Sequence, residues 1–377
     1  MENKELAPET TGPFKDAKVI HTLPWNSEAI TSVAFVGNDK VAAANKRGDI
    51  LIWNLSVPDG KTPDPVRLLA GHSNEVNRII VTPDGKTLIS VSCDHTVKYW
   101  DALSESGDPG KTNLSGIVRK AVIALDAKAL APPEPVEVDV VVQKPTRELT
   151  GHKEWVYGLA LTPDGKTLIT GDDEGVVIVW DLAAGRELRR WQSKYWARAL
   201  GISPDGKTVA LSEYFSFRKS DPNDPCRAFK FWDVATGEPK LDLSKEVKET
   251  MTAVKYSADG KWLAVCCGDS GEEKPSGKVM LLEPETGKII RELAPPHPLG
   301  AADLAYHPDG KHLFSAGRDQ LVKIWQLEDG KHLRDLGNFK ERGDWICAIS
   351  ISPDGHLLAA ADMKGQIVVY SLTRSAT

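Results

Sequence analysis

A short turn motif that recurs along the chain constrains the fold more than any other feature. Pro-Asp-Gly, or in one case Ala-Asp-Gly, begins at residues 83, 163, 204, 258, 308 and 353. Proline fixes φ, aspartate bonds the local backbone and glycine accepts a positive φ, so each copy predicts a tight turn. Successive copies lie 41 to 54 residues apart, except for a gap of 80 between the first two. A period of this length predicts a repeat architecture.

Each turn lies between strand-like segments. In the clearest copy, residues 156–161 alternate in the period-2 manner of a half-buried strand, residues 168–170 begin a second strand and residues 176–180 form a third. Such a unit is marginally stable alone and must pack against its neighbours. With a degenerate copy at residues 37–39 there are seven units. Their cores span about residues 25–55, 72–102, 152–182, 193–234, 248–284, 297–327 and 342–372.

The ends of these units resemble a known family. Gly151-His152 and Trp180-Asp181, and likewise His72 and Trp100-Asp101, are similar to the Gly-His and Trp-Asp signatures of WD-repeat β-propellers. The resemblance implies an all-β fold, a seven-bladed propeller over residues 15–373 with four-stranded antiparallel blades. It also implies that an N-terminal strand, here residues 16–23, closes the ring. Residues 1–14 are then expected to be a flexible tail.

The resemblance further implies a hydrogen-bonded structural tetrad inside the blades. The matching residues are His72, Ser90, Asp94 and Trp100 in blade 2, and His297, Ser315, Asp319 and Trp325 in blade 6. Blade 3 offers His152, Thr170 and Trp180, with Glu174 at the aspartate position. Catalytic triads use the same residue types, but a network repeated from blade to blade is typical of a scaffold. We therefore expect these residues to hold the blades together.

The residues before and within the first strand of each unit surround the mouth of the central channel in this family. Here they include Trp155, Tyr157, Trp196, Arg198 and Trp345. An insertion at about 212–228 adds further aromatic and basic residues on the same rim, namely Tyr214, Phe215, Phe217 and Arg218. Tryptophan and arginine dominate the energetics of interfaces. Packing at blade ends would also explain the tryptophans, whereas packing does not require an arginine. We expect these nine residues to bind a partner.

Charge and composition exclude several classes of function. The net charge is −6, with 47 basic and 53 acidic residues, which argues against binding of nucleic acid. No apolar run approaches the roughly 20 residues of a membrane span. Residues 1–11 lack the hydrophobic core of a secretory signal, so we expect a cytoplasmic protein; a chain from which a signal had been removed would look the same. Five cysteines show neither a disulfide framework nor metal-ligand spacing.

Three functional hypotheses follow. The leading one is a non-enzymatic scaffold or adaptor that binds a partner protein or peptide through the channel mouth, as a monomeric propeller within a larger complex. No HExxH, CxxC or GxSxG motif is present, so we expect no catalytic residues, metal or cofactor. The alternative is a propeller that binds a small molecule or metal, or acts as an enzyme, at the same mouth. In the third hypothesis the functional element is the 103–145 insertion between blades 2 and 3, with a helix-like segment at 117–129 and a strand-like one at 136–142.

Overall fold

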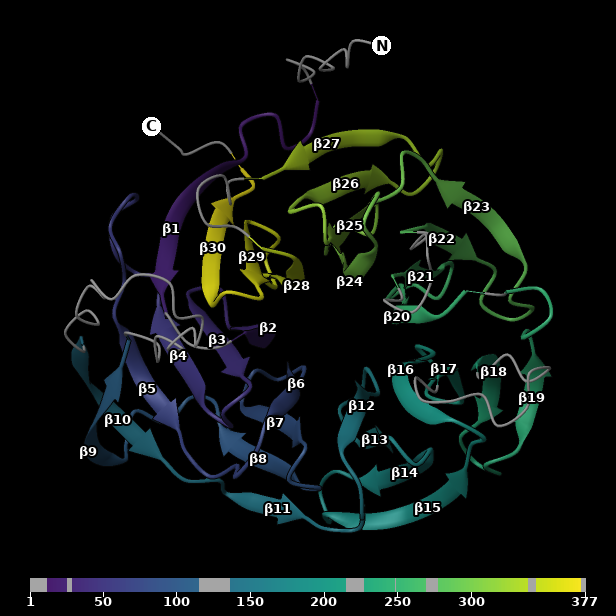
Figure 1. Ribbon diagram of the computed structural model, residues 1–377, viewed down its shortest axis with the longest axis horizontal. Helices are drawn as coiled ribbons and strands as arrows, with labels where there is room; N and C mark the ends of the chain where they lie inside the picture. The colour runs from purple at the N-terminus through teal and green to yellow at the C-terminus, as the bar shows by residue number, and fades with distance from the viewer. Residues whose placement is uncertain are drawn as a thin grey trace, which may run out of the picture.

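The computed structural model describes residues 12–25, 29–114, 136–214, 227–247, 249–268, 277–337 and 344–373. Within these ranges every regular element is a β-strand, and the strands form seven sheets. The sheets are arranged radially around one axis, as the blades of a β-propeller (Figure 1). In each blade four core strands follow one another from the axis outward, antiparallel to their neighbours. The fold predicted from the repeated turns is therefore confirmed.

The first four blades follow chain order. Blade 1 contains β2 (Ile30–Val36), β3 (Lys40–Asn45), β4 (Ile50–Asn54) and β5 (Pro65–Leu69). Blade 2 contains β6 (Val76–Val81), β7 (Thr87–Ser92), β8 (Val97–Asp101) and β11 (Arg147–Leu149). Blade 3 contains β12 (Val156–Leu161), β13 (Thr167–Asp172), β14 (Val176–Asp181) and β15 (Arg186–Gln192). Blade 4 contains β16 (Trp196–Ile202), β17 (Thr208–Tyr214), β18 (Arg227–Asp233) and β19 (Pro239–Asp242).

The last three blades complete the ring. Blade 5 contains β20 (Met251–Tyr256), β21 (Leu263–Cys267), β22 (Val279–Leu282) and β23 (Ile289–Leu293). Blade 6 contains β24 (Ala301–Tyr306), β25 (His312–Gly317), β26 (Val322–Gln326) and β27 (His332–Leu336). Blade 7 contains β28 (Ile346–Ile351), β29 (Leu357–Asp362), β30 (Gln366–Ser371) and, from the start of the chain, β1 (Lys18–Pro24).

The first strand closes the ring. β1 pairs antiparallel with β30, from Lys18 opposite Ser371 to Pro24 opposite Gln366. This pairing covers an edge that would otherwise expose unpaired backbone groups. The segment before it is also fixed, because the Phe14 ring packs edge-on against Phe314 of blade 6 at 5.4 Å. Phe14, which we expected to belong to a flexible tail, therefore contacts the propeller, and residues 1–11 lie outside the described residues.

The large insertion extends blade 1. In the sequence it lies between the third and fourth strands of blade 2, and it forms β9 (Asp108–Asn113) and β10 (Glu137–Gln143). β10 lies parallel to β5, so blade 1 becomes a six-stranded sheet. Arg67 of β5 fixes the start of the insertion, because its buried guanidinium donates to the carbonyls of Asp101, Ala102 and Ser104. The helix expected at 117–129 lies outside the described residues.

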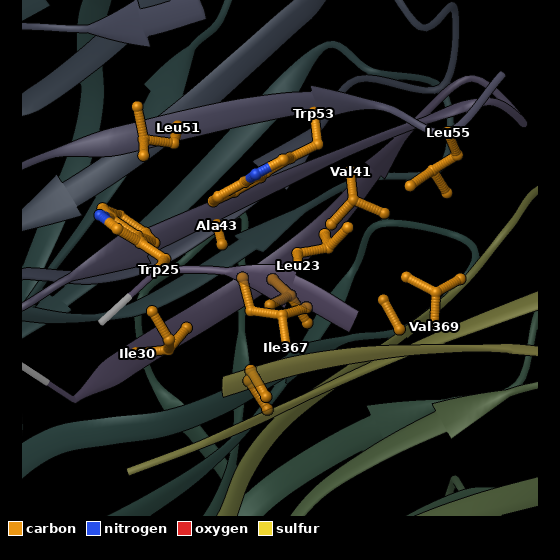
Figure 2. Packing of buried hydrophobic residues seen from close by; sticks show 14 of the residues in the cluster. Leu23, Trp25, Ile30, Val41, Ala43, Leu51, Trp53, Leu55, Ile367 and Val369 are labelled. Atoms are coloured by element: carbon orange, nitrogen blue, oxygen red, sulfur yellow. The ribbon is translucent and has the colours of Figure 1, made fainter. Parts of the chain in front are cut away.

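Apolar side chains between adjacent blades form the core. Figure 2 shows the cluster between blades 7 and 1, where Leu23 and Ile367 lie against side chains of the first blade. Trp25 packs edge-on against Trp53, with ring centroids 5.5 Å apart. Elsewhere the blades approach so closely that a Cβ built on Gly171 would lie 2.6 Å from the carbonyl oxygen of Ala197. The blades are thus closely packed against one another.

Candidate functional site

A chain of hydrogen bonds crosses the interior of blade 6. His297 Nδ1 lies 2.8 Å from Asp319 Oδ1, and His297 Nε2 lies 2.8 Å from Ser315 Oγ. The indole N–H of Trp325 donates to the same Ser315 oxygen at 2.9 Å. Blade 2 repeats the arrangement. There the distances are 2.8 Å for His72–Asp94, 2.7 Å for His72–Ser90 and 2.8 Å for Trp100–Ser90.

Blade 3 makes the same network with a different carboxylate. His152 Nδ1 lies 2.7 Å from Asp172 Oδ2, and Thr170 Oγ1 takes the place of serine for both His152 and Trp180. The expectation that Glu174 fills the aspartate position is wrong, because Glu174 is exposed. Asp172 lies two residues after Thr170, so strand periodicity turns its side chain toward the same face and the same histidine.

The network has the character of internal support. The His297, Ser315 and Trp325 side chains are fully buried, so the hydroxyl cannot reach a substrate. Burial alone would raise the pKa of Asp94, but hydrogen bonds from His72 and Thr96 hold that pKa well below its usual range. The carboxylate is therefore stabilised in its charged form inside the blade.

The blades without the network show what its hydroxyl contributes. The indole N–H groups of Trp53 in blade 1 and Trp232 in blade 4 are buried without a hydrogen-bond partner. The position equivalent to Ser90 holds Ala43 in blade 1 and Leu211 in blade 4, and neither side chain can accept a hydrogen bond. A serine or threonine at this one position thus decides whether a buried indole is satisfied.

At the channel mouth, the innermost strand of every blade carries a β-bulge at the same place. The pairing register shifts by one residue there, and the seven extra residues are Thr31, Asn77, Tyr157, Arg198, Thr252, Ala302 and Cys347. A bulged residue has no partner in the ladder, so its side chain is re-aimed. Here the bulges face the end of the channel, where six of the seven side chains line one cavity of about 350 Å³.

Four of these bulged residues link adjacent blades. Asn77 Nδ2 donates to Val156 O of blade 3 at 2.7 Å, and Thr252 Oγ1 donates to Ala301 O of blade 6 at 2.8 Å. Thr31 and Cys347 make the equivalent bonds to the first residues of β6 and β2. Small polar side chains at the bulges therefore form a belt that holds neighbouring inner strands together.

Tyr157 and Arg198 interrupt this belt with large side chains. The Arg198 guanidinium carbon lies 4.1 Å from the centre of the Tyr157 ring and 4.6 Å from that of Trp196. Its Nε atom is buried without a hydrogen-bond partner. The positive charge of Arg198 also acts on the Asp173 carboxyl, where it opposes the rise in pKa that burial causes. Burial raises the pKa of Tyr157, so its ring is neutral and presents its face to the cation. Arg198 thus places a cation at the channel mouth, where aromatic rings hold it and its Nε–H donor is unpaired.

Two exposed tryptophans flank the mouth on opposite sides of the ring. Trp155 precedes β12 and is 45% exposed, while Trp345 precedes β28 and is 44% exposed. Figure 1 shows β12 and β28 on opposite sides of the propeller axis. Arg318 lies over the Trp345 ring at 4.7 Å, so an arginine and an aromatic ring meet on this side as well.

Basic residues predominate around the mouth cavity. Lys46, Arg78, Arg198 and Arg318 line it together with a single acidic side chain, Glu75. Arg78 crosses the channel from blade 2, reaching Thr252 O at 3.4 Å and Asp303 Oδ1 at 3.9 Å. Arg78 therefore forms the floor of the cavity.

Comparison with known proteins agrees with the repeat pattern. The family model of the WD domain, G-beta repeat, matches residues 63–101, 143–181, 287–326 and 333–371. Each match runs from the fourth strand of one blade through the third strand of the next. The chain is a WD-repeat β-propeller. This offset between repeat and blade is what leaves β1 to supply the outermost strand of blade 7.

A similar protein is a subunit of a multi-protein assembly. The target of rapamycin complex subunit wat1 of Schizosaccharomyces pombe is 25% identical to this WD-repeat propeller over 250 residues, which are 64% of this chain and 74% of the relative. Across the described part of the propeller, no helix has the length and apolarity to cross a bilayer.

The residues predicted for partner binding are brought together only in part. Tyr157, Trp196 and Arg198 form one cluster, to which Tyr214 adds a ring edge-on to Trp196 at 6.2 Å. Trp155 and Trp345 lie on the same rim of the WD-repeat propeller. Phe215, Phe217 and Arg218 lie outside the described residues. The basic residues Lys46, Arg78 and Arg318 were not among those predicted from the sequence. Their recurring location, in the turn after the second strand or next to a bulge, is the signal that could have found them.

Proposed function

We propose that this WD-repeat propeller is a non-enzymatic interaction scaffold that binds a segment of a partner protein across its channel mouth. The observation that carries the proposal is Arg198, a cation stacked on Tyr157 and Trp196 whose Nε atom is buried without a hydrogen-bond partner. Where four other blades use a small residue to bond the next blade, this position projects donors into the mouth. The similarity to a complex subunit supports a role within a larger assembly.

The exposed tryptophans give the proposed partner a source of binding energy. About half of each indole is uncovered at Trp155 and at Trp345, on the order of 100 Å² of mostly apolar surface per ring. Covering that area would contribute roughly 2–3 kcal/mol per ring before the costs of association. A segment that lies across the channel could contact both rings and offer an acceptor to Arg198 between them.

The test compares a mouth variant with a matched edge variant. The mouth variant is Trp155→Ala, Arg198→Ala, Trp345→Ala; the edge variant is Leu188→Ala, Ile290→Ala, which removes side chains of similar exposure, 50% and 46%, from the outer strands. Proteins co-purified from the native host are identified by mass spectrometry, and the affinity of each purified partner is then measured. We expect partners that bind the mouth variant at least about tenfold more weakly and the edge variant normally, with both melting like wild type.

An identical set of partners with unchanged affinities would contradict the proposal and move the interaction site to the β9–β10 insertion. Arg198→Lys refines the result. It keeps the charge but loses the planar donors that stack on the rings, and it is expected to lose most of the affinity that Arg198→Ala loses.

A small anionic ligand in the mouth is the second candidate. The cavity of about 350 Å³ is within the size range of small-molecule sites, and four basic side chains line it. Native mass spectrometry of the purified protein would detect a bound mass that disappears in Arg198→Ala. A bound mass that is retained in that variant, or the absence of any bound mass, would contradict this second candidate and leave protein binding as the remaining proposal.

A further inference from the structure

The turn between β24 and β25 in blade 6 differs from the other Pro-Asp-Gly turns. In five of them a serine or threonine hydroxyl donates to the turn aspartate over 2.5–2.7 Å: Thr82 to Asp84, Thr162 to Asp164, Ser203 to Asp205, Ser257 to Asp259 and Ser352 to Asp354. In blade 6 this position holds His307, and a second histidine follows the turn at position 312. The turn therefore reads His-Pro-Asp-Gly-Lys-His.

Three potential ligand atoms converge in this turn. Asp309 Oδ2 lies 3.0 Å from His307 Nδ1 and 2.7 Å from His312 Nδ1. All three atoms lie within 4.8 Å of one another. Two imidazole nitrogens and one carboxylate oxygen are a usual ligand set for Zn²⁺ and related transition-metal ions.

The orientation of His307 is fixed by a separate hydrogen bond. Its Nε2 lies 2.9 Å from the carbonyl oxygen of Gly355 in blade 7, and a carbonyl can only accept, so the proton lies on Nε2. In the neutral ring Nδ1 then carries a lone pair, and it accepts the backbone N–H of Asp309 at 3.2 Å. The same nitrogen lies 3.0 Å from Asp309 Oδ2, so a metal ion bound there would take over the lone pair that accepts this N–H. A ring N–H bonded to a carbonyl is also how proteins orient metal-binding histidines.

The surroundings hold the three ligands in place. The Phe14 ring contacts the His307 and His312 rings edge-on, at 5.2 and 4.9 Å. The backbone N–H of Lys311 donates to Asp309 Oδ1 at 2.8 Å and leaves Oδ2 to face the histidines. In the turns of blades 3 to 5 the lysine at this position forms an ion pair with the aspartate, but Lys311 forms none with the described residues.

We propose that His307, Asp309 and His312 form a binding site for a divalent transition-metal ion of the Zn²⁺ class. Tetrahedral ligands at bond lengths of about 2.0–2.1 Å are separated by about 3.3 Å, so the two Asp309 contacts open slightly and the histidines close by at most about 1.5 Å. Asp309 is at the surface, which leaves the fourth position to water. The bound ion cross-links the turn beneath the segment that carries Phe14 into the ring closure.

The test is a titration of the tag-free full-length protein with ZnCl₂ at pH 7.5, followed by calorimetry and by the melting temperature. We expect one Zn²⁺ per chain, a Kd in the micromolar range, a higher melting temperature and no response to Mg²⁺. His307→Ser rebuilds the turn of the other blades and so keeps the fold. Since outer-sphere partners alone are worth about 10–100-fold in affinity, loss of a ligand in His307→Ser or Asp309→Asn is expected to weaken binding at least that much.

His356→Ser is the matched control. His356 lies in the equivalent turn of blade 7, with Nδ1 3.4 Å from Asp354, but it has no third ligand. This variant is expected to bind Zn²⁺ like wild type. The proposal is overturned if the wild type binds no Zn²⁺ below millimolar concentration. Binding that survives in both His307→Ser and Asp309→Asn overturns it as well, because the ion would then be held elsewhere.

Discussion

Replacing Ser315 by alanine removes the one oxygen atom on which two buried hydrogen bonds depend. Asp319 can only accept, so the proton of the neutral His297 ring lies on Nδ1, and Nε2 accepts the Ser315 hydroxyl. The same oxygen then accepts the Trp325 indole N–H. The His297, Ser315 and Trp325 side chains are inaccessible, so water cannot replace the lost group. Each stranded buried polar group costs about 1–3 kcal/mol, so we expect Ser315→Ala, which strands two, to destabilise blade 6 by about 2–6 kcal/mol.

Hydrogen exchange measured by mass spectrometry can localise this loss. Repeat proteins open locally, so the amides of β25 and β26 are compared with those of β7 and β8, where the network of blade 2 is intact. A loss of 2 kcal/mol corresponds to about 30-fold faster exchange in blade 6, with blade 2 unchanged.

A double-mutant cycle separates the hydrogen bond from simple loss of packing. Trp325→Phe removes the indole N–H, so the added cost of Ser315→Ala should be smaller in that background than in wild type. Equal costs in the two backgrounds, or unchanged exchange in β25 and β26, would refute the view that this oxygen is the centre of the network.

Three further predictions test the electrostatics and the packing of the blades. Asp94→Ala is expected to lower the free energy of unfolding by roughly 1–3 kcal/mol at pH 7. This deficit should shrink below about pH 4, because the pKa of Asp94 is depressed in the folded state and its contribution to stability is lost as the carboxylate protonates. An unchanged melting temperature at pH 7 would contradict the prediction. Burial raises the pKa of Glu213 although Lys230 lies 3.6 Å away, so the folded protein binds this proton more tightly than the unfolded chain does, and stability falls as the pH rises through that interval. The melting temperature of Glu213→Gln should therefore rise relative to that of wild type as the pH is raised from 5 to 7.5. A difference in melting temperature that is constant with pH would contradict this. Gly171→Ala is expected to cost about 1–3 kcal/mol in thermal or denaturant unfolding, because its Cβ would overlap the Ala197 carbonyl oxygen of the next blade; an unchanged midpoint would show that the blades can separate freely.

Contacts within one blade were the most predictable from the sequence. The His72 and Ser90 positions are 18 residues apart and Ser90 is 10 residues before Trp100, and the same spacing holds in blades 3 and 6. Strand length and turn length fix such distances, so a pattern in the sequence becomes a pattern in space. The error at Glu174 has the same local origin, because the carboxylate can also come from the strand face two residues after the hydroxyl.

The sequence alone determined the number of blades, the order of the strands within each repeat and most residues of the internal network, because each of these depends on neighbours within one repeat. It did not determine the carboxylate of blade 3 or the pairing of the β9–β10 insertion with blade 1. Tertiary structure decided which side chains from different blades meet. The stacking of Arg198 on Tyr157, the position of Arg318 over Trp345 and the contact of Phe14 with the blade 6 histidines all depend on how the ring closes. The physical reason is that turns and strand register fix geometry within a blade, whereas contacts between blades follow from the packing and rotation of whole sheets, which no local pattern encodes.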